Sequence, residues 1–340
     1  MTPLRYLNGV LAVLLIPCNL LAAEVSRLRP VHTYSIVARD ANTGELGVAV
    51  QSHWFSVGSV VSWAEAGVGA VATQSFVEVS YGPLGLQLMR AGKTPDQTLS
   101  ALLSTDEHKA VRQVAMVDAQ GSIAVHTGDH CIAEAGHRTG EGYSVQANLM
   151  GPATVPDAMA EAFESSEGPL AERLLATLLA AQATGGDIRG KQSAAILVVR
   201  GTSTGKPWED RLVDLHVEDH HEPLQEMRRL LQLHRAYEHM NAGDVAMETQ
   251  DFEAARREYG AAQELAPGNA EMLFWHAITL VGAGFVDDAE PLLARAYGYD
   301  DNWRTLVGRL PASGLLEDDA LLLKRLTALK AIAPEAETVK

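Results

Sequence analysis

Alternation of apolar and polar positions is clearest near the start of the chain, in residues 32–52. Two segments with the two-residue period of a β-strand flank Asn42, Thr43 and Gly44, whose residue types are typical of a tight turn. The pattern predicts a β-hairpin with the hydroxyl residue Thr33 at the head of its first strand.

The same alternation predicts further strands at residues 59–63, 69–74, 113–117, 122–126, 143–148, 193–199 and 211–217. Helical spacing appears in residues 82–92, in a segment that begins after Thr94 and Pro95, and in residues 155–163 and 170–183. The order is therefore strands, two helices, strands, two helices, strands. A doubly wound parallel sheet would alternate single strands with single helices. The order instead predicts an α+β fold, a four-layer α-β-β-α sandwich in which each helix pair covers one sheet.

Strand patterns end near residue 224, and a repeat takes their place. Residues 251–255 recur loosely as residues 285–289, a shift of 34 residues, which is the period of a tetratricopeptide repeat. We expect an all-α, tetratricopeptide-like domain over residues 225–340, with flanking helices at 223–241 and 318–332. Such helix pairs could bind a peptide or protein in a groove. Packing against the first domain or against a second subunit, as in a homo-oligomer, is the alternative.

The first 23 residues have the pattern of a secretory signal. A positive charge at Arg5 precedes a mostly apolar stretch, and the small residues Ala22 and Ala23 follow it. The sequence thus predicts a signal peptide at 1–23, a spacer at 24–32 and a sandwich domain at 33–224. The location expected is periplasmic or secreted, without membrane attachment after cleavage. Cys18 would leave with the leader, so the mature chain would retain Cys131 and form no internal disulfide.

Composition narrows the possible partners. The chain of 340 residues has 47% hydrophobic residues, as folded proteins do, and its length favours two domains. Its formal net charge of -16 disfavours nucleic acids and anionic membrane surfaces, since both require basic patches.

Several stretches of the sandwich region together point to a known family: residues 33–40, 47–52, 67–74, 112–113, 185–195, 210–211 and 219–220. Through them the region resembles a bacterial family, domain of unknown function 1028 (DUF1028), over roughly residues 33–224. The resemblance implies the fold of N-terminal-nucleophile (Ntn) hydrolases. Many members begin Met-Thr, whereas this chain has a leader and a spacer before Thr33.

The resemblance also implies a chemistry, in which a free N-terminal Thr33 attacks an amide carbonyl with its own α-amine as the base. The substrate would be a small-molecule or peptide-like amide, with neither cofactor nor metal. We expect Asp40, Arg112 and Asp187 to tune charge beside the Thr33 nucleophile. The expected substrate-binding residues are Ser52, Gln74, Asn148, Arg189, Gln192 and Ser193, with Arg189 holding a carboxylate and the amides stabilising an oxyanion.

Plainer interpretations stay open for several of these residues. Thr33 is also an ordinary strand-forming residue, and the Ntn chemistry requires cleavage of the His32–Thr33 bond. Residues 185–189 are also consistent with a helix stop followed by a structural Asp187–Arg189 ion pair, and Ser193 with a small residue at a strand start.

Other catalysts and other functions are also open. Ser35 or Ser52 could be the nucleophile instead. Asp214, His216 and Glu218 share one face of a predicted strand, which suits either a three-ligand metal site or a solvated surface. A non-catalytic scaffold that acts through its helical repeats is the alternative function.

Overall fold

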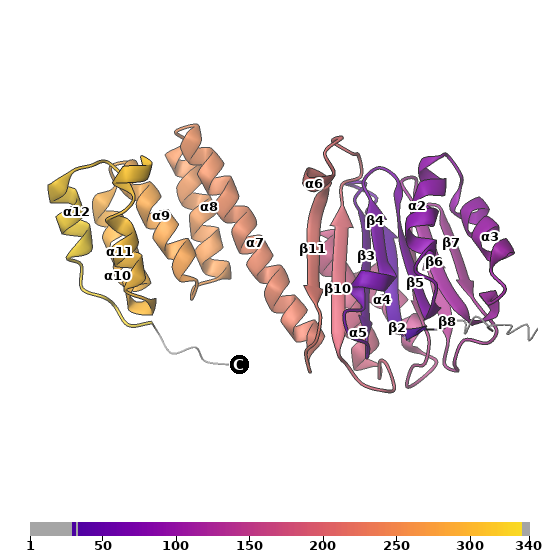
Figure 1. Cartoon of the computed structure of the whole chain (residues 1–340). Helices are drawn as coiled ribbons and strands as arrows, with labels where there is room; N and C mark the ends of the chain where they lie inside the picture. The colour runs from indigo at the N-terminus through magenta and orange to yellow at the C-terminus, as the bar shows by residue number, and fades with distance from the viewer. Residues whose placement is uncertain (1–28, 32, 335–340) are drawn as a thin grey trace, which may run out of the picture.

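The structure is a computed structural model that describes residues 29–31 and 33–334. The leader expected at 1–23, its cleavage point near Ala23 and most of the expected spacer lie outside the described residues. The described chain forms two antiparallel sheets with associated helices, followed by a helical region (Figure 1). The predicted α+β class and the helical C-terminal part are therefore confirmed.

The first sheet has five strands, with the order β1-β5-β6-β7 and with β4 also paired to β5. Its strands are β1 (Arg29–Val31), β4 (Ser62–Glu65), β5 (Gly69–Val77), β6 (Arg112–Asp118) and β7 (Ile123–Thr127). The second sheet has six strands in the order β11-β10-β3-β2-β9-β8. These are β2 (Thr33–Arg39), β3 (Leu46–Ser52), β8 (Gly136–Gly140), β9 (Tyr143–Ala147), β10 (Ser193–Val199) and β11 (Arg211–Val217).

Helices pack on the outer face of each sheet, and the two inner faces pack on each other. Helices α2 (Tyr81–Arg90) and α3 (Pro95–Thr105) share an apolar cluster with β5 and β6. Helices α4 (Val155–Ser165) and α5 (Leu170–Ala183) share a larger one with β2, β3, β9 and β10. A third cluster joins the sheets, with Val37 and Val48 on one side and Ala72 and Val117 on the other. The alternation of side chains along each strand separates these clusters.

The predicted hairpin is present as β2 and β3. Thr33 pairs with Ser52 at its open end, and Arg39 pairs with Leu46 next to the turn. Gly44 adopts a φ of 75°, a left-handed conformation that glycine enters without a steric penalty. The β-hairpin and the turn that the sequence predicts are therefore confirmed.

Three segments differ from the pattern-based expectation. Residues expected as a strand at 59–63 begin instead as a short helix, α1 (Gly58–Val61), and enter β4 afterwards. The edge strand β8 was not predicted because its sequence, Gly-His-Arg-Thr-Gly, has no apolar alternation. Strand β1 lies in the expected spacer and is only three residues long, with a central proline.

The C-terminal region consists of helices throughout its described residues. They are α7 (Pro223–Glu248), α8 (Phe252–Leu265), α9 (Ala270–Gly282), α10 (Val286–Tyr299), α11 (Asn302–Val307) and α12 (Ala320–Thr327). The helical region also contains the short 3-10 helix η2 (Pro311–Ser313). Two further short elements lie in the sheet-containing part, the 3-10 helix η1 (Lys109–Val111) and α6 (Pro207–Asp210). Helix α7 extends beyond the predicted end at 241, whereas α12 is shorter than the predicted 318–332.

Helix α7 connects the two parts of the molecule (Figure 1). Near its start, Met227 and Leu231 belong to the core of the second sheet. Further along, Ala236 and Met240 belong to a separate core with α8. Gly243 permits the close approach of α8, since a Cβ there would lie 2.6 Å from the Tyr259 ring. One continuous helix therefore contributes to both cores.

Candidate active site

The space between the two sheets is apolar at one end and polar at the other. Thr33 and Ser35 lie on the same face of β2 as the core residue Val37, because alternate strand residues share a face. The same alternation brings polar residues from five other strands and from the residue after β9 to this end. All of them are fully buried: Thr33, Ser35, Ser52, Gln74, Gln113, Ser144, Gln146, Asn148 and Ser193. We refer to these nine residues as the inter-sheet polar cluster.

Thr33 lies at the head of β2, in the middle of the second sheet. Its carbonyl accepts hydrogen bonds from the Asn148 main-chain N–H at 3.1 Å and from Gln74 Nε2 at 3.2 Å. Ser52 is its partner across the β2–β3 ladder. The structure thus brings five of the predicted site residues, Thr33, Ser52, Gln74, Asn148 and Ser193, into this cluster.

Side-chain amides connect the sheets through this cluster. Gln74 Nε2 donates to Gln113 Oε1 at 2.7 Å, and Asn148 Nδ2 donates to the same oxygen at 2.9 Å. Ser35 Oγ donates to Gln74 Oε1 and accepts from Gln146 Nε2, both at 2.6 Å. A buried amide without a partner costs about 1–3 kcal/mol, so these reciprocal bonds fix the cluster in one arrangement.

The amides that the sequence suggests as oxyanion donors already hold protein acceptors. Gln74 Nε2 is directed at Gln113, at the Thr33 carbonyl and at the Gln146 carbonyl. Asn148 Nδ2 contacts Gln113 and, at 3.4 Å, the Thr33 carbonyl. In this arrangement both amides position Thr33, and their contact with a substrate stays a prediction.

Asp187 and Arg189 form an ion pair on the loop that follows α5. The Asp187 carboxylate is completely buried and accepts from Arg189 Nη2 at 2.7 Å and from Arg189 Nε at 3.0 Å. It also accepts from the main-chain N–H of His53, the residue after β3, at 3.2 Å. The pair therefore lies next to the end of β3 that carries Ser52. A substrate contact by Arg189, whose side chain is 27% exposed, stays a prediction.

Tyr34, on the outer face of β2, connects this strand to β3 and to helix α5. Its hydroxyl donates to Gln51 Oε1 and also lies 3.1 Å from Gln182 Oε1. Burial, with the nearby negative charge of Asp187 as a second cause, raises the pKa of Tyr34 well above its usual value. Tyr34 is consequently a neutral hydrogen-bond donor at physiological pH.

Gln192 and Ser193 use their side chains locally. The Ser193 hydroxyl donates to the Trp54 carbonyl and accepts from the Val57 N–H at 3.1 Å, which holds the segment after β3. Gln192 donates to the Ser52 carbonyl through its main chain and to Asp219 through its side chain. Ser193 is a member of the cluster and Gln192 precedes it in the chain; the Ser193 contacts agree with the plainer structural interpretation.

Asp40 lies at the opposite end of β2 from Thr33, seven residues away and therefore about 23 Å along an extended strand. Its carboxylate accepts from the N–H groups of Asn42 and Thr43, each at 2.9 Å, and pairs with Arg173 at 3.1 Å. Burial alone would raise the pKa of Asp40, but these hydrogen bonds and the Arg173 charge hold it below its usual value. The structure does not bring Asp40 to Thr33.

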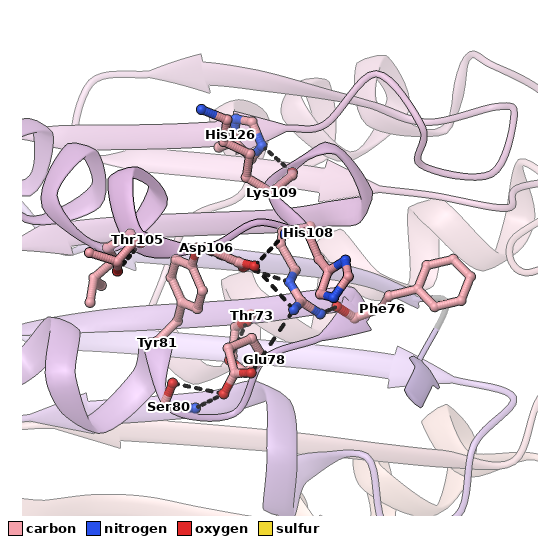
Figure 2. A network of polar contacts seen from close by, with 12 residues as sticks. Thr73, Phe76, Glu78, Ser80, Tyr81, Thr105, Asp106, His108, Lys109 and His126 are labelled. Carbon is pink, nitrogen blue, oxygen red and sulfur yellow. Dashed lines mark hydrogen bonds and ion pairs between the residues drawn. The ribbon is translucent and has the colours of Figure 1, made fainter. Parts of the chain in front are cut away.

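Arg112 lies at the start of β6, next to Gln113 of the cluster but on the alternate face of the strand. Its Nε donates to Asp106 at 2.8 Å, and its Nη1 donates to the Phe76 carbonyl at 2.6 Å. Figure 2 shows Asp106, Phe76 and Tyr81 around this contact, with the Tyr81 hydroxyl 3.1 Å from Asp106. Arg112 thus fixes the end of β5 and does not reach the interior of the cluster.

The histidine- and acid-rich strand β11 lies at the edge of the second sheet. His216 Nε2 is 3.0 Å from Asp214 Oδ1, Arg211 also pairs with Asp214, and Glu218 is 3.8 Å from His216. Among the described residues, no group of three His, Cys, Asp or Glu side chains is arranged to hold a metal ion.

No helix within residues 29–31 and 33–334 has the length and apolar character needed to cross a membrane.

Gln113, Gln146 and Ser144 are cluster members that the sequence analysis did not select. Gln113 shares the inward face of β6 with the apolar residues Ala115 and Val117, whereas Ser144 and Gln146 alternate with the outer-face residues Tyr143, Val145 and Ala147 of β9. A polar residue at an inward position of a buried strand was the available signal. Which strand it would meet could not be inferred from spacing.

Comparison with known proteins identifies the family. A family model described as "Family of unknown function (DUF1028)" matches residues 33–227, so the chain belongs to this family, as the resemblance predicted. The crystal structure of protein SPO2555 from Silicibacter pomeroyi, also assigned to DUF1028, is similar to the chain at 32% identity and a TM-score of 0.54. The similarity covers 59% of this chain and 85% of SPO2555. No curated protein matches the chain.

Proposed function

We propose that the chain is an Ntn-type amidohydrolase in which Thr33 becomes the N-terminal nucleophile. The observation that carries this proposal is the position of Thr33, a hydroxyl residue at the head of a central strand, within the inter-sheet polar cluster. The family match begins at the same residue. The stacked antiparallel sheets with helices outside them are consistent with a four-layer Ntn-type sandwich.

Cleavage of the His32–Thr33 bond is the condition for this chemistry. In the continuous chain the Thr33 nitrogen is an amide and cannot act as a base, and Thr33 is fully buried. Removal of the preceding residues creates an α-amine with an ordinary pKa of about 7.7–8.0. A useful fraction of this amine is unprotonated near neutral pH.

The reaction proceeds through an ester. The α-amine takes the Thr33 hydroxyl proton while Oγ attacks the amide carbonyl carbon, forming a C–O bond. The C–N bond then breaks, and the proton passes to the leaving amine. Water hydrolyses the ester, which releases a carboxylic acid and restores the hydroxyl. Gln74 and Asn148 position Thr33, and the partly exposed guanidinium of Arg189, which Asp187 holds in place, is the proposed contact for a substrate carboxylate.

We further propose that the protein is exported and that its helical region is tetratricopeptide-like. Helices α8 and α10 begin at Phe252 and Val286, in agreement with the 34-residue shift. A groove of about 880 Å³ in this region is lined by Arg229, Arg295 and Tyr299, and the described lining residues include no carboxylate. Arg229 is paired with Glu226, so the charge of the groove is partly neutralised. The groove favours a second candidate function, the binding of a peptide or protein segment.

The first test is the N-terminus of the protein recovered from its native compartment, measured by intact mass and N-terminal sequencing. We expect a chain that begins at Thr33. Recovery of chains that all begin before Thr33 would remove the chemical basis of the proposal.

The second test is substitution of Thr33 in an assay against a library of amides. Thr33→Ala should abolish hydrolysis, a loss of at least about 10³-fold, whereas Thr33→Ser should retain measurable activity because it keeps the hydroxyl. Unchanged turnover in Thr33→Ala would direct the search to Ser35 or Ser52. Circular dichroism of both variants controls for folding.

A further inference from the structure

We propose that the edge of β5 next to Thr33 is the binding site for the acyl half of the substrate, and that the substrate is an extended peptide-like chain. This inference rests on the proposed function and adds a substrate class to it. Strand β1 occupies this edge in the continuous chain. A substrate takes its place after cleavage, by strand addition.

Two short strands share the outer edge of β5. Strand β4 pairs with Gly69–Ala72, ending at the Ser62–Ala72 pair. Strand β1 pairs antiparallel with the far end, with Val31 opposite Ser75 and Arg29 opposite Val77. On its other side this far end is held by β6, where Ser75 pairs with Arg112. Removal of β1 would therefore uncover the outer edge of Ser75–Val77 alone. Unpaired strand edges accept another extended chain.

The composition of β1 makes it easy to displace. It is three residues long, and Pro30 has no N–H to donate. Because bonded and non-bonded pairs alternate in an antiparallel ladder, we assign the main-chain hydrogen bonds to the Arg29–Val77 and Val31–Ser75 pairs. Once the His32–Thr33 bond is cut, these few main-chain bonds are the described attachment of β1 to the sheet.

The edge itself is held from the other side. Arg112 Nη1 donates to the Phe76 carbonyl at 2.6 Å, and its guanidinium is anchored by Asp106 at 2.8 Å. The Thr73 hydroxyl donates to the Glu78 carbonyl at 3.1 Å, and Figure 2 shows these two residues next to each other. These bonds do not involve β1, so the Ser75–Val77 edge keeps its shape when β1 leaves. This gives Arg112 a positioning role at the site.

The chain runs directly from β1, on the edge of β5, to the proposed nucleophile Thr33. Val31 lies opposite Ser75, and Thr33 follows two residues later in the chain; the Thr33 carbonyl is 3.2 Å from Gln74 Nε2. The carbonyl carbon attached to the Thr33 nitrogen is within reach of the Thr33 hydroxyl by covalent geometry alone. A peptide in the place of β1 therefore presents its next carbonyl to Thr33 Oγ. Recognition through the main chain predicts tolerance of different side chains at the residues opposite Ser75 and Val77.

Peptide binding to a processed but inactive chain tests this site. The protein is residues 33–340 carrying Thr33→Ala, and the probe is acetyl-Arg-Pro-Val-His-amide, titrated by calorimetry. Methylation of the valine nitrogen removes the donor opposite Ser75 and should weaken binding at least 10-fold. Replacement of the arginine and valine side chains by alanine should change it less than about 3-fold. Absent saturable binding, or equal binding of the N-methylated peptide, would overturn the inference.

The outcome separates this inference from the proposed function. Binding without any hydrolysis by the matching Thr33 chain would contradict the hydrolase and leave the β5 edge as a peptide site. Hydrolysis of amides that the probe does not inhibit would support the hydrolase and contradict the β5 edge. If the shortened chain does not fold, the full-length chain carrying Val31→Pro and Thr33→Ala serves instead, since it removes the second N–H of β1 and should bind the probe more tightly than Thr33→Ala alone.

Discussion

A glutamine side chain buried between two sheets needs hydrogen-bond partners for one carbonyl oxygen and two N–H groups. Gln113 does so completely: its oxygen accepts from Gln74 and Asn148, and its nitrogen donates to Thr127 Oγ1 and the Ala147 carbonyl. A buried polar network in which some groups lack hydrogen-bond partners destabilises the fold more than apolar residues in its place would. The complete pairing therefore indicates that polarity is maintained at this end of the sandwich, where Thr33 lies.

His276 is a second buried polar residue, in the core of the helical region. Its ring stacks on Tyr259 at 4.7 Å, and its Nδ1 is 2.6 Å from Gln263 Nε2. Its Nε2 has no partner within the described chain. Burial, with the charge of Arg256 as a second cause, lowers the pKa of His276 to about 4.

The lowered pKa predicts that acid destabilises the helical region. Between pH 6.5 and 4 the unfolded chain binds a proton at this histidine and the folded chain does not, so stability falls as pH falls. The loss is at most about 3 kcal/mol and levels off below pH 4. Urea unfolding at several pH values should show this slope in the wild type and a reduced slope in His276→Phe. Equal slopes would contradict the assignment.

At the scale of elements, the β2–β3 hairpin illustrates how a turn is stabilised by its own first residue. The Asp40 carboxylate accepts two main-chain N–H groups of the turn and pairs with Arg173 of α5. It therefore attaches the hairpin to the helix layer as well as closing the turn.

Substitution of Asp40 should affect stability more than catalysis. Asp40→Ala leaves the turn N–H groups and Arg173 without their acceptor, and we expect a loss of about 2 kcal/mol in the free energy of unfolding. Asp40→Asn keeps part of the turn contacts and should lose less. Both should retain kcat/KM within about 3-fold, measured on whichever amide is hydrolysed. A large loss of kcat/KM at unchanged stability would restore the catalytic role that the sequence suggested.

At the scale of the whole molecule, α7 determines how the two parts unfold. Its first half packs on the second sheet through Met227 and Leu231, and its second half packs on α8 through Ala236 and Met240. Arg235 of α7 also pairs with Glu172 of α5 at 2.6 Å. A rigid helix shared by two cores transmits unfolding from one core to the other.

A proline in the exposed middle of α7 should uncouple the two parts. Glu238→Pro removes a helical hydrogen bond and clashes with the preceding turn, at a cost of about 3 kcal/mol. Calorimetry should show one main transition in the wild type and in the control Glu238→Ala, and two transitions in Glu238→Pro. A single transition in all three proteins would show that coupling does not depend on α7.

The order of elements and the hairpin could be predicted from the sequence alone, because side-chain alternation and turn residues act over a few neighbouring positions. For the same reason Thr33 could be selected as the head of a strand. Residues such as Gln146 could not be selected, since their partners lie on strands far away in sequence.

The tertiary structure alone decided which candidates meet. It brought Ser52, Gln74 and Asn148 to Thr33, and it separated Asp40 from them by the length of a strand. It also paired β1 with the end of β5, although three residues around a proline carry no strand signal of their own. The physical reason is that spacing along the chain specifies local conformation, whereas pairing between strands depends on how the sheets align and pack.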